Sequence, residues 1–187
     1  MLRRILLAIV VVLIMVPPGY AREIAGVEMP DLLTIGENTL LLNGAGVRTK
    51  LFLDFYAGGL YLKQKAHDPA IIIAADEVMA VRLQIVSSII TSERMAKATR
   101  EGFEKATGGN IAAIESRMEQ FISVFKDKLS KNDIFDLLYV PGRGVEIYKN
   151  EQSHSIIEGL DFKQALFGIW LGEDPAQKSL KKHMLGQ

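Results

Sequence analysis

The 187-residue chain has no cysteine, three histidines and equal numbers of basic and acidic residues, 22 of each. Without cysteine it can form neither a disulfide nor a thiolate metal site, and the histidines, at positions 67, 154 and 183, are scattered without ligand spacing. Its balanced charge gives no overall field that would attract nucleic acid or an anionic membrane. We therefore predict no metal, no cofactor and no nucleic-acid partner, and a fold held together by packing alone.

Two sequence patterns that are typical of hydrolases and of dinucleotide-binding sites are present only in part. Ser153 and Ser155 flank His154, but they lack the glycines of a nucleophile elbow. Residues 44–46 read Gly-Ala-Gly, like the start of a dinucleotide fingerprint, but the third glycine is missing and a strand is expected to follow. Neither pattern predicts a hydrolase or a nucleotide site.

The first 21 residues have the layout of a cleavable secretory signal. Arg3 and Arg4 precede an apolar run from Ile5 to Val16, and small residues precede a cut after Ala21. A membrane anchor is the alternative, but a run of roughly a dozen residues is shorter than the about 20 needed to cross a bilayer. We expect residues 22–187 to form one exported domain, periplasmic or secreted, with no stable membrane anchor after signal cleavage.

The stretch from Asn43 to Lys63 is expected to form a central hairpin. It has no proline, it is rich in aromatic and aliphatic residues, and its glycine pairs suit bulges or close backbone approaches. Within it, Arg48 is flanked by small and apolar residues. An arginine in such surroundings usually has an anionic partner, supplied either by the protein, with Asp54 the nearest acid to consider, or by a ligand.

The residues around this hairpin predict edge strands between Arg22 and Leu42 and then a short helix, with Asp68 as N-cap and Pro69 in its first position. Residues 78–86 alternate as in a strand with one face on the core. Arg82 lies on the other face. It is a second candidate anchor, although an exposed strand arginine is the simpler interpretation.

The second half predicts two helices, a hairpin and a helical tail. The first helix runs from a cap at Thr91 or Ser92 to Gly108, and the second begins at Asn110. The second helix carries an apolar stripe that favours core packing over a cofactor site: Ile111, Ile114, Met118, Phe121, Ile122, Phe125 and Leu129.

A hairpin over residues 134–148 follows, and capping patterns at Asp161 and Asp174 predict the tail helices. Because strands and helices do not alternate, this order indicates an α+β fold.

Three segments together resemble the chalcone isomerase-like family, in particular its exported bacterial branch. They read NGAGVRTK at 43–50, FLDFYAGGLYL at 52–62 and FKQALFGIWLG at 162–172. The resemblance implies an open-faced β-sandwich, in which a large antiparallel sheet is covered by a layer of helices with a ligand cleft between them.

The resemblance also implies candidate site residues. Plant isomerases of this family close a chalcone ring, whereas fatty-acid-binding members hold a carboxylate in the same cleft; in both an arginine binds the anion, and Arg48 occupies its position. The other positions depart from the isomerases. Tyr56 stands at a threonine, Arg94 and Glu101 at a tyrosine and an asparagine of the first helix, and Ile169 at a hydroxyl residue near the end.

We therefore predict a binding protein without catalytic residues, whose ligand is a small amphipathic acid such as a fatty acid. One alternative is an isomerase or intramolecular lyase that uses Arg48 as electrophile with Glu101 or Tyr56 as acid or base. Another is an interaction protein with a vestigial cleft. Eight residues along one strand span about 26 Å, so Arg48 and Tyr56 can meet only if the chain turns back near Thr49.

Overall fold

The computed structural model describes residues 21–126 and 129–187. The expected secretory signal, residues 1–21, lies outside the described residues apart from its last position. Within the described part of the chain, no helix is long and apolar enough to span a membrane.

The fold is organised around one antiparallel sheet of seven strands, in which each strand pairs with its neighbours in sequence order. The strands are β3 (Leu32–Ile35), β4 (Asn38–Lys50), β5 (Leu53–Leu62), β6 (Met79–Ile85), β7 (Ile134–Val140), β8 (Gly144–Lys149) and β9 (Gln152–Ile157). A separate two-stranded hairpin precedes them, with β1 (Ala21–Ile24) and β2 (Val27–Pro30).

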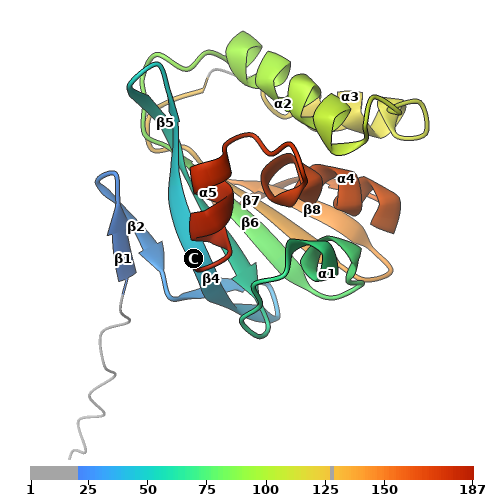
Figure 1. The fold of residues 1–187 in the computed structure, drawn as a ribbon, viewed down its shortest axis with the longest axis horizontal. Helices are drawn as coiled ribbons and strands as arrows, with labels where there is room; N and C mark the ends of the chain where they lie inside the picture. Colours follow the sequence, from blue (N-terminus) through green and yellow to red (C-terminus); the bar gives the residue numbers. More distant parts are fainter. Residues whose placement is uncertain (1–20, 127–128) are drawn as a thin grey trace, which may run out of the picture.

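Helices cover one face of this sheet, and the β1–β2 hairpin lies on the other side (Figure 1). The helices are α1 (Pro69–Ala74), α2 (Ser92–Ala106), α3 (Glu115–Ser123), α4 (Leu160–Leu171) and α5 (Lys178–Met184). The α+β architecture predicted from the sequence, a large antiparallel sheet under a layer of helices, is confirmed.

Local sequence signals set the beginnings of two helices. The Asp68 carboxylate accepts a hydrogen bond of 2.8 Å from the backbone N–H of Ala70, and Pro69 takes the first helical position of α1. Thr91 caps α2 by accepting from the backbone N–H of Arg94. Both caps were predicted.

Other predicted boundaries are wrong by several residues. The apolar stripe from Ile111 to Leu129 packs on the sheet as expected, but of its described residues, 111–126 and 129, only 115–123 are helical. The tail helices begin at Leu160 and Lys178. The predicted caps do not occupy the N-cap positions, which are Gly159 and Gln177. The Asp161 carboxylate accepts hydrogen bonds from Arg117, and Asp174 pairs with Lys105.

The sheet has a core on each face, which corrects the expectation for residues 78–86. Met79, Val81 and Leu83 pack under the helices, while Ala80 belongs to a second apolar cluster with residues of β2, β3 and β4. The reading of Arg82 as an exposed arginine is therefore wrong. Its side chain is 13% exposed and forms two hydrogen bonds with Asp136, of 2.6 and 2.8 Å.

Glycines in the central hairpin let α5 approach the sheet closely. A Cβ on Gly44 would lie 2.1 Å from the backbone oxygen of His183, and one on Gly46 would lie 2.8 Å from the side chain of His183. These contacts confirm that the glycines serve a close backbone approach. They hold the last helix against β4, next to the strand segment that carries Arg48.

Candidate functional site

The register of the central hairpin places Arg48 and Tyr56 directly opposite each other. The chain reverses at Leu51 and Phe52, and Arg48 on β4 pairs with Tyr56 on β5 beside an irregularity at Thr49. The condition that the chain turn back near Thr49 is therefore met. Cross-strand partners share a face of the sheet, and Tyr56 belongs to the core on the helix side.

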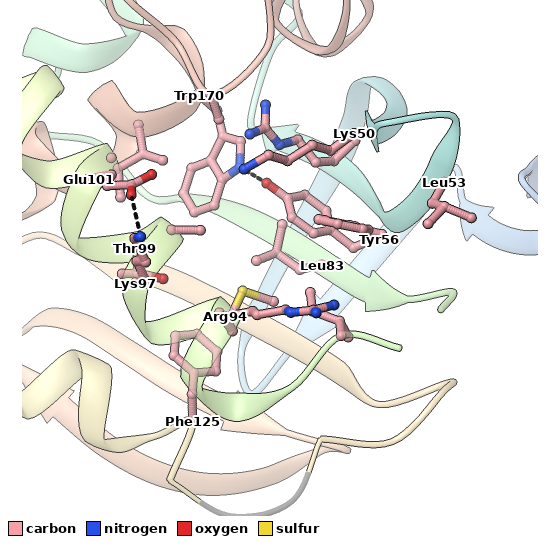
Figure 2. Close-up of a pocket in the computed structure, with 18 of the residues that line it drawn as sticks. Lys50, Leu53, Tyr56, Leu83, Arg94, Lys97, Thr99, Glu101, Phe125 and Trp170 are labelled. Atoms are coloured by element: carbon pink, nitrogen blue, oxygen red, sulfur yellow. Dashed lines mark hydrogen bonds and ion pairs between the residues drawn. The ribbon is translucent and has the colours of Figure 1, made fainter. Parts of the chain in front are cut away.

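A cavity of about 440 Å³ opens on this face, between the sheet and helices α2 and α4 (Figure 2). Its volume lies within the range of small-molecule sites. Most of its wall is apolar or aromatic, formed by Phe55, Leu83, Ile90, Met95, Ala98, Phe121, Phe125, Ile169, Trp170 and Ala176. Arg48, Tyr56 and Thr99 add polar groups to the lining.

Tyr56 is fixed by the only tryptophan of the chain. The indole N–H of Trp170 donates a hydrogen bond of 3.0 Å to the buried Tyr56 hydroxyl, as Figure 2 shows. Burial raises the pKa of Tyr56, and the hydrogen bond from Trp170 and the charge of Arg48 offset this rise only in part. The phenol therefore stays protonated at neutral pH, and its O–H has no acceptor among the described residues.

Arg48 is half-buried and has no carboxylate partner in the part of the chain that the structure describes. In the described ranges no acidic oxygen lies within 4.0 Å of its guanidinium, and no hydrogen bond is formed by its side chain. Asp54, the nearest acid in sequence, instead accepts a hydrogen bond of 2.8 Å from the Thr49 hydroxyl. Among the described residues, Arg48 therefore has no carboxylate that neutralises its charge.

The other predicted site residues on the helices also line the cavity. Arg94 is exposed at the start of α2 and donates to the backbone oxygen of Ile89 at 3.3 Å. Glu101 is exposed and lies 3.9 Å from the ammonium of Lys97. Ile169 is buried and forms apolar wall, packing so closely on α2 that a Cβ at Gly102 would lie 2.8 Å from it.

Arg82 is the predicted site residue that the fold places elsewhere. It is on the opposite face of β6 from Leu83 and is not part of the cavity wall. Burial by itself lowers the pKa of Arg82, but the hydrogen bonds and charge of Asp136 more than offset this and raise it. Arg82 therefore has its anion within the protein.

Sequence reasoning missed Trp170, Thr99 and a group of lysines. Trp170, the single tryptophan of the chain, lies in the segment 162–172 that resembles the family, but the sequence predicts no role for it in the site. Lys50, Lys97 and Lys105 also line the cavity. The spacing of these lysines along the chain does not predict a shared site, because they come from β4 and α2, two elements that are far apart in sequence. No cluster of three or more potential metal ligands occurs in the described part of the chain.

These features define a class of protein: an antiparallel sheet under a helical layer, with an apolar cavity between them and a cation at its wall. A family model described as chalcone isomerase-like matches residues 21–186. The chain belongs to the chalcone isomerase-like family.

Two similar proteins show how far this likeness extends. The crystal structure of a fatty-acid binding protein from Arabidopsis thaliana superimposes with a TM-score of 0.66 and 22% sequence identity, covering 86% of this chain and 92% of that one. At this identity the likeness is one of fold. The phenylalanine–tRNA ligase beta subunit of Korarchaeum cryptofilum (strain OPF8) is 27% identical over 117 residues, which cover 63% of this chain but only 20% of that protein.

Proposed function

We propose that this protein binds an amphipathic carboxylic acid, such as a fatty acid, in the cavity between sheet and helices and does not convert it chemically. One observation carries the proposal. Half-buried Arg48, without a carboxylate partner in the described residues, is the cross-strand partner of Tyr56, whose hydroxyl proton has no acceptor there, and both residues line the cavity.

These two groups suit a carboxylate. The guanidinium offers a charged fork of N–H donors, and the phenol supplies a neutral O–H donor from the neighbouring strand. Because the indole of Trp170 already occupies one lone pair of the Tyr56 oxygen, the phenolic proton is oriented away from the indole. An acid head placed between them would be the anionic partner that Arg48 otherwise lacks among the described residues.

The rest of the cavity suits an apolar tail. The cavity is lined by the buried side chains of Leu83, Met95, Phe121 and Phe125. An apolar tail that leaves water for this cavity gains hydrophobic free energy, about 25 cal/mol per Å² of its surface. An open volume of about 440 Å³ favours a ligand over a vestigial cleft filled by the protein's own side chains. The likeness to a plant fatty-acid binding protein supports the same ligand class.

The non-catalytic part of the proposal rests on the remaining polar groups. The pKa of Tyr56 is raised by burial, which does not favour a tyrosinate base. Glu101, the carboxylate in the wall, is exposed and neighbours Lys97 rather than the Arg48–Tyr56 pair. Arg94 and Ile169 then belong to the mouth and the wall, respectively.

Mass spectrometry of the purified protein tests the proposal. Under native conditions the protein from an expression host should carry a bound acid, and Arg48→Ala should lose it while Lys63→Ala, an exposed cation outside the cavity wall, retains it. No ligand in the wild type, or equal ligand in Arg48→Ala, would refute acid binding. Cyclisation of a chalcone above the spontaneous rate that disappears in Arg48→Ala would refute the non-catalytic part.

We also propose that the protein acts in the periplasm or outside the cell, with residues 1–21 removed. The support is the charged, apolar and small-residue order of this segment. The intact mass of the protein from a periplasmic extract should correspond to a chain beginning at Arg22. A full-length chain in the membrane fraction would contradict this.

A further inference from the structure

The turn of the central hairpin exposes three consecutive apolar residues. Leu51, Phe52 and Leu53 are 81%, 100% and 47% exposed, and we refer to them as the hairpin tip. Leu51 and Phe52 also have positive φ values of 52° and 65°. Bulky side chains disfavour this region, and two-residue turns of this kind usually contain asparagine, aspartate or glycine. Neither core packing nor turn geometry therefore accounts for these residues.

The hairpin tip is continuous with the mouth of the cavity. Leu51 and Leu53 line it together with Ile89, which is 43% exposed and precedes α2. In Figure 1 this turn lies at the end of the β4–β5 hairpin that is farthest from α1, on the side where α2 begins. Apolar surface thus extends from the turn into the binding cavity.

The lining of this cavity carries more cations than carboxylates, although the whole chain has no net charge. Its wall includes one carboxylate, that of Glu101, and five cations: Arg48, Lys50, Arg94, Lys97 and Lys105. Lys97 neighbours Glu101 and Lys105 neighbours Asp174. In the described ranges, Arg48, Lys50 and Arg94 have no acidic oxygen within 4.0 Å. Although the charges of the whole chain cancel, these unpaired cations produce a local positive field that attracts anions.

We propose that the hairpin tip docks on an anionic lipid bilayer, so that the cavity mouth faces the membrane and exchanges its acid with it. This inference rests on the proposed function for the identity of the cargo. Apolar residues entering the headgroup region and cations facing anionic lipid are the two signals that together give stable but reversible membrane binding. The ligand then passes between bilayer and cavity without crossing water.

A membrane fits the tip better than a protein partner does. A stable protein interface buries about 800 Å² per partner, far more than the end of one hairpin offers. A bilayer needs no matching surface, and each cation near it adds roughly a factor of five in affinity. Because its net charge is zero, the protein is not attracted to an anionic membrane over long distances. The cations near the hairpin tip still interact with anionic lipid once they are within about 10 Å of it.

The absence of cysteine permits a direct test in the full chain. Phe52→Cys and Ile71→Cys, the latter on α1 and also highly exposed, would each be labelled with an environment-sensitive fluorophore. Vesicles of phosphatidylcholine containing phosphatidylglycerol should shift the emission at position 52 to the blue and leave position 71 unchanged. The shift should weaken without phosphatidylglycerol and at high salt.

The variant Phe52→Ser tests whether the hairpin tip matters for ligand exchange, because Phe52 is not part of the cavity wall and its replacement should not affect the cavity itself. It should bind a fluorescent fatty acid in solution as the wild type does, partition to the vesicles roughly tenfold less, and take up the acid from them more slowly.

Equal signals at positions 52 and 71 would overturn the inference. So would a shift at position 52 that grows with protein concentration without vesicles, because it would place a second copy on the tip. Failure of the proposed function would look different: no acid would bind in solution, whether or not the tip enters the vesicles.

Discussion

Replacing Arg48 by methionine distinguishes two possible roles of this residue, ligand binding and stabilisation of the fold. Methionine keeps an unbranched apolar stem like that of arginine but removes the guanidinium with its charge and every donor. Because Arg48 has no ion pair or side-chain hydrogen bond among the described residues, the substitution breaks no contact of the unliganded protein. It removes a half-buried charge. The free energy of unfolding should therefore change by no more than about 0.5 kcal/mol, the range of substitutions outside structural features.

Acid binding should respond quite differently. A hydrogen bond to a charged group contributes about 1.5–3 kcal/mol. The loss of the guanidinium removes this contribution from the protein–acid complex and leaves the unliganded protein unaffected. The dissociation constant for a fatty acid should rise roughly 10- to 150-fold. Arg48→Lys, which keeps the charge without the planar fork, should give an intermediate loss.

The two quantities are measured on the same samples. Displacement of a fluorescent fatty acid gives the affinity, and urea unfolding of the unliganded protein gives the stability. Lys63→Met is the matched control for the loss of one positive charge, and it should alter neither. If Arg48→Met lost more than about 1 kcal/mol of stability and kept its affinity, Arg48 would be a structural residue and the reasoning would be refuted.

Three further substitutions probe the surroundings of the site. Tyr56→Phe should weaken acid binding about tenfold and also cost about 1–3 kcal/mol in thermal unfolding, because the buried indole N–H of Trp170 loses its acceptor. Asp136→Asn should destabilise the protein by about 3 kcal/mol without affecting acid affinity, since it disrupts the pair with buried Arg82 on the other face of the sheet; equal loss of affinity would contradict the separation of the faces. The pKa of Lys163, whose ammonium donates to three backbone oxygens at the end of α1, is lowered to about 8 by burial. The unfolded chain thus binds more protons between pH 8 and 10.5, and the stability of the wild type relative to Lys163→Met should rise across this window; a flat difference would exclude the shift.

Several elements could be predicted because their signals are local. Asp68 followed by Pro69, and Thr91 before an amphipathic segment, mark helix starts through contacts within three residues. The glycines and the aromatic and aliphatic residues of the central hairpin likewise predicted close approach and strand pairing.

The errors arose where a partner far along the chain decides the outcome. Asp161 and Asp174 have the sequence pattern of caps, but Arg117 and Lys105 engage their carboxylates. Arg82 was read as an exposed arginine because its partner, Asp136, lies 54 residues away in sequence and adjacent only in the sheet. The periodicity of a sequence indicates which residues face a core, but it does not indicate which side chain of a neighbouring strand each residue contacts.

The amino-acid sequence by itself determined the α+β class, the family and the single arginine in the central hairpin, because composition, periodicity and motif spacing are properties of contiguous residues. Only the tertiary structure decided that Arg48 lacks an acid within the described chain, that Trp170 orients Tyr56, and that apolar and cationic residues share one cavity mouth. The physical reason is that charge compensation and cavity shape depend on distances in space, and those are set when strands and helices remote in sequence pack together.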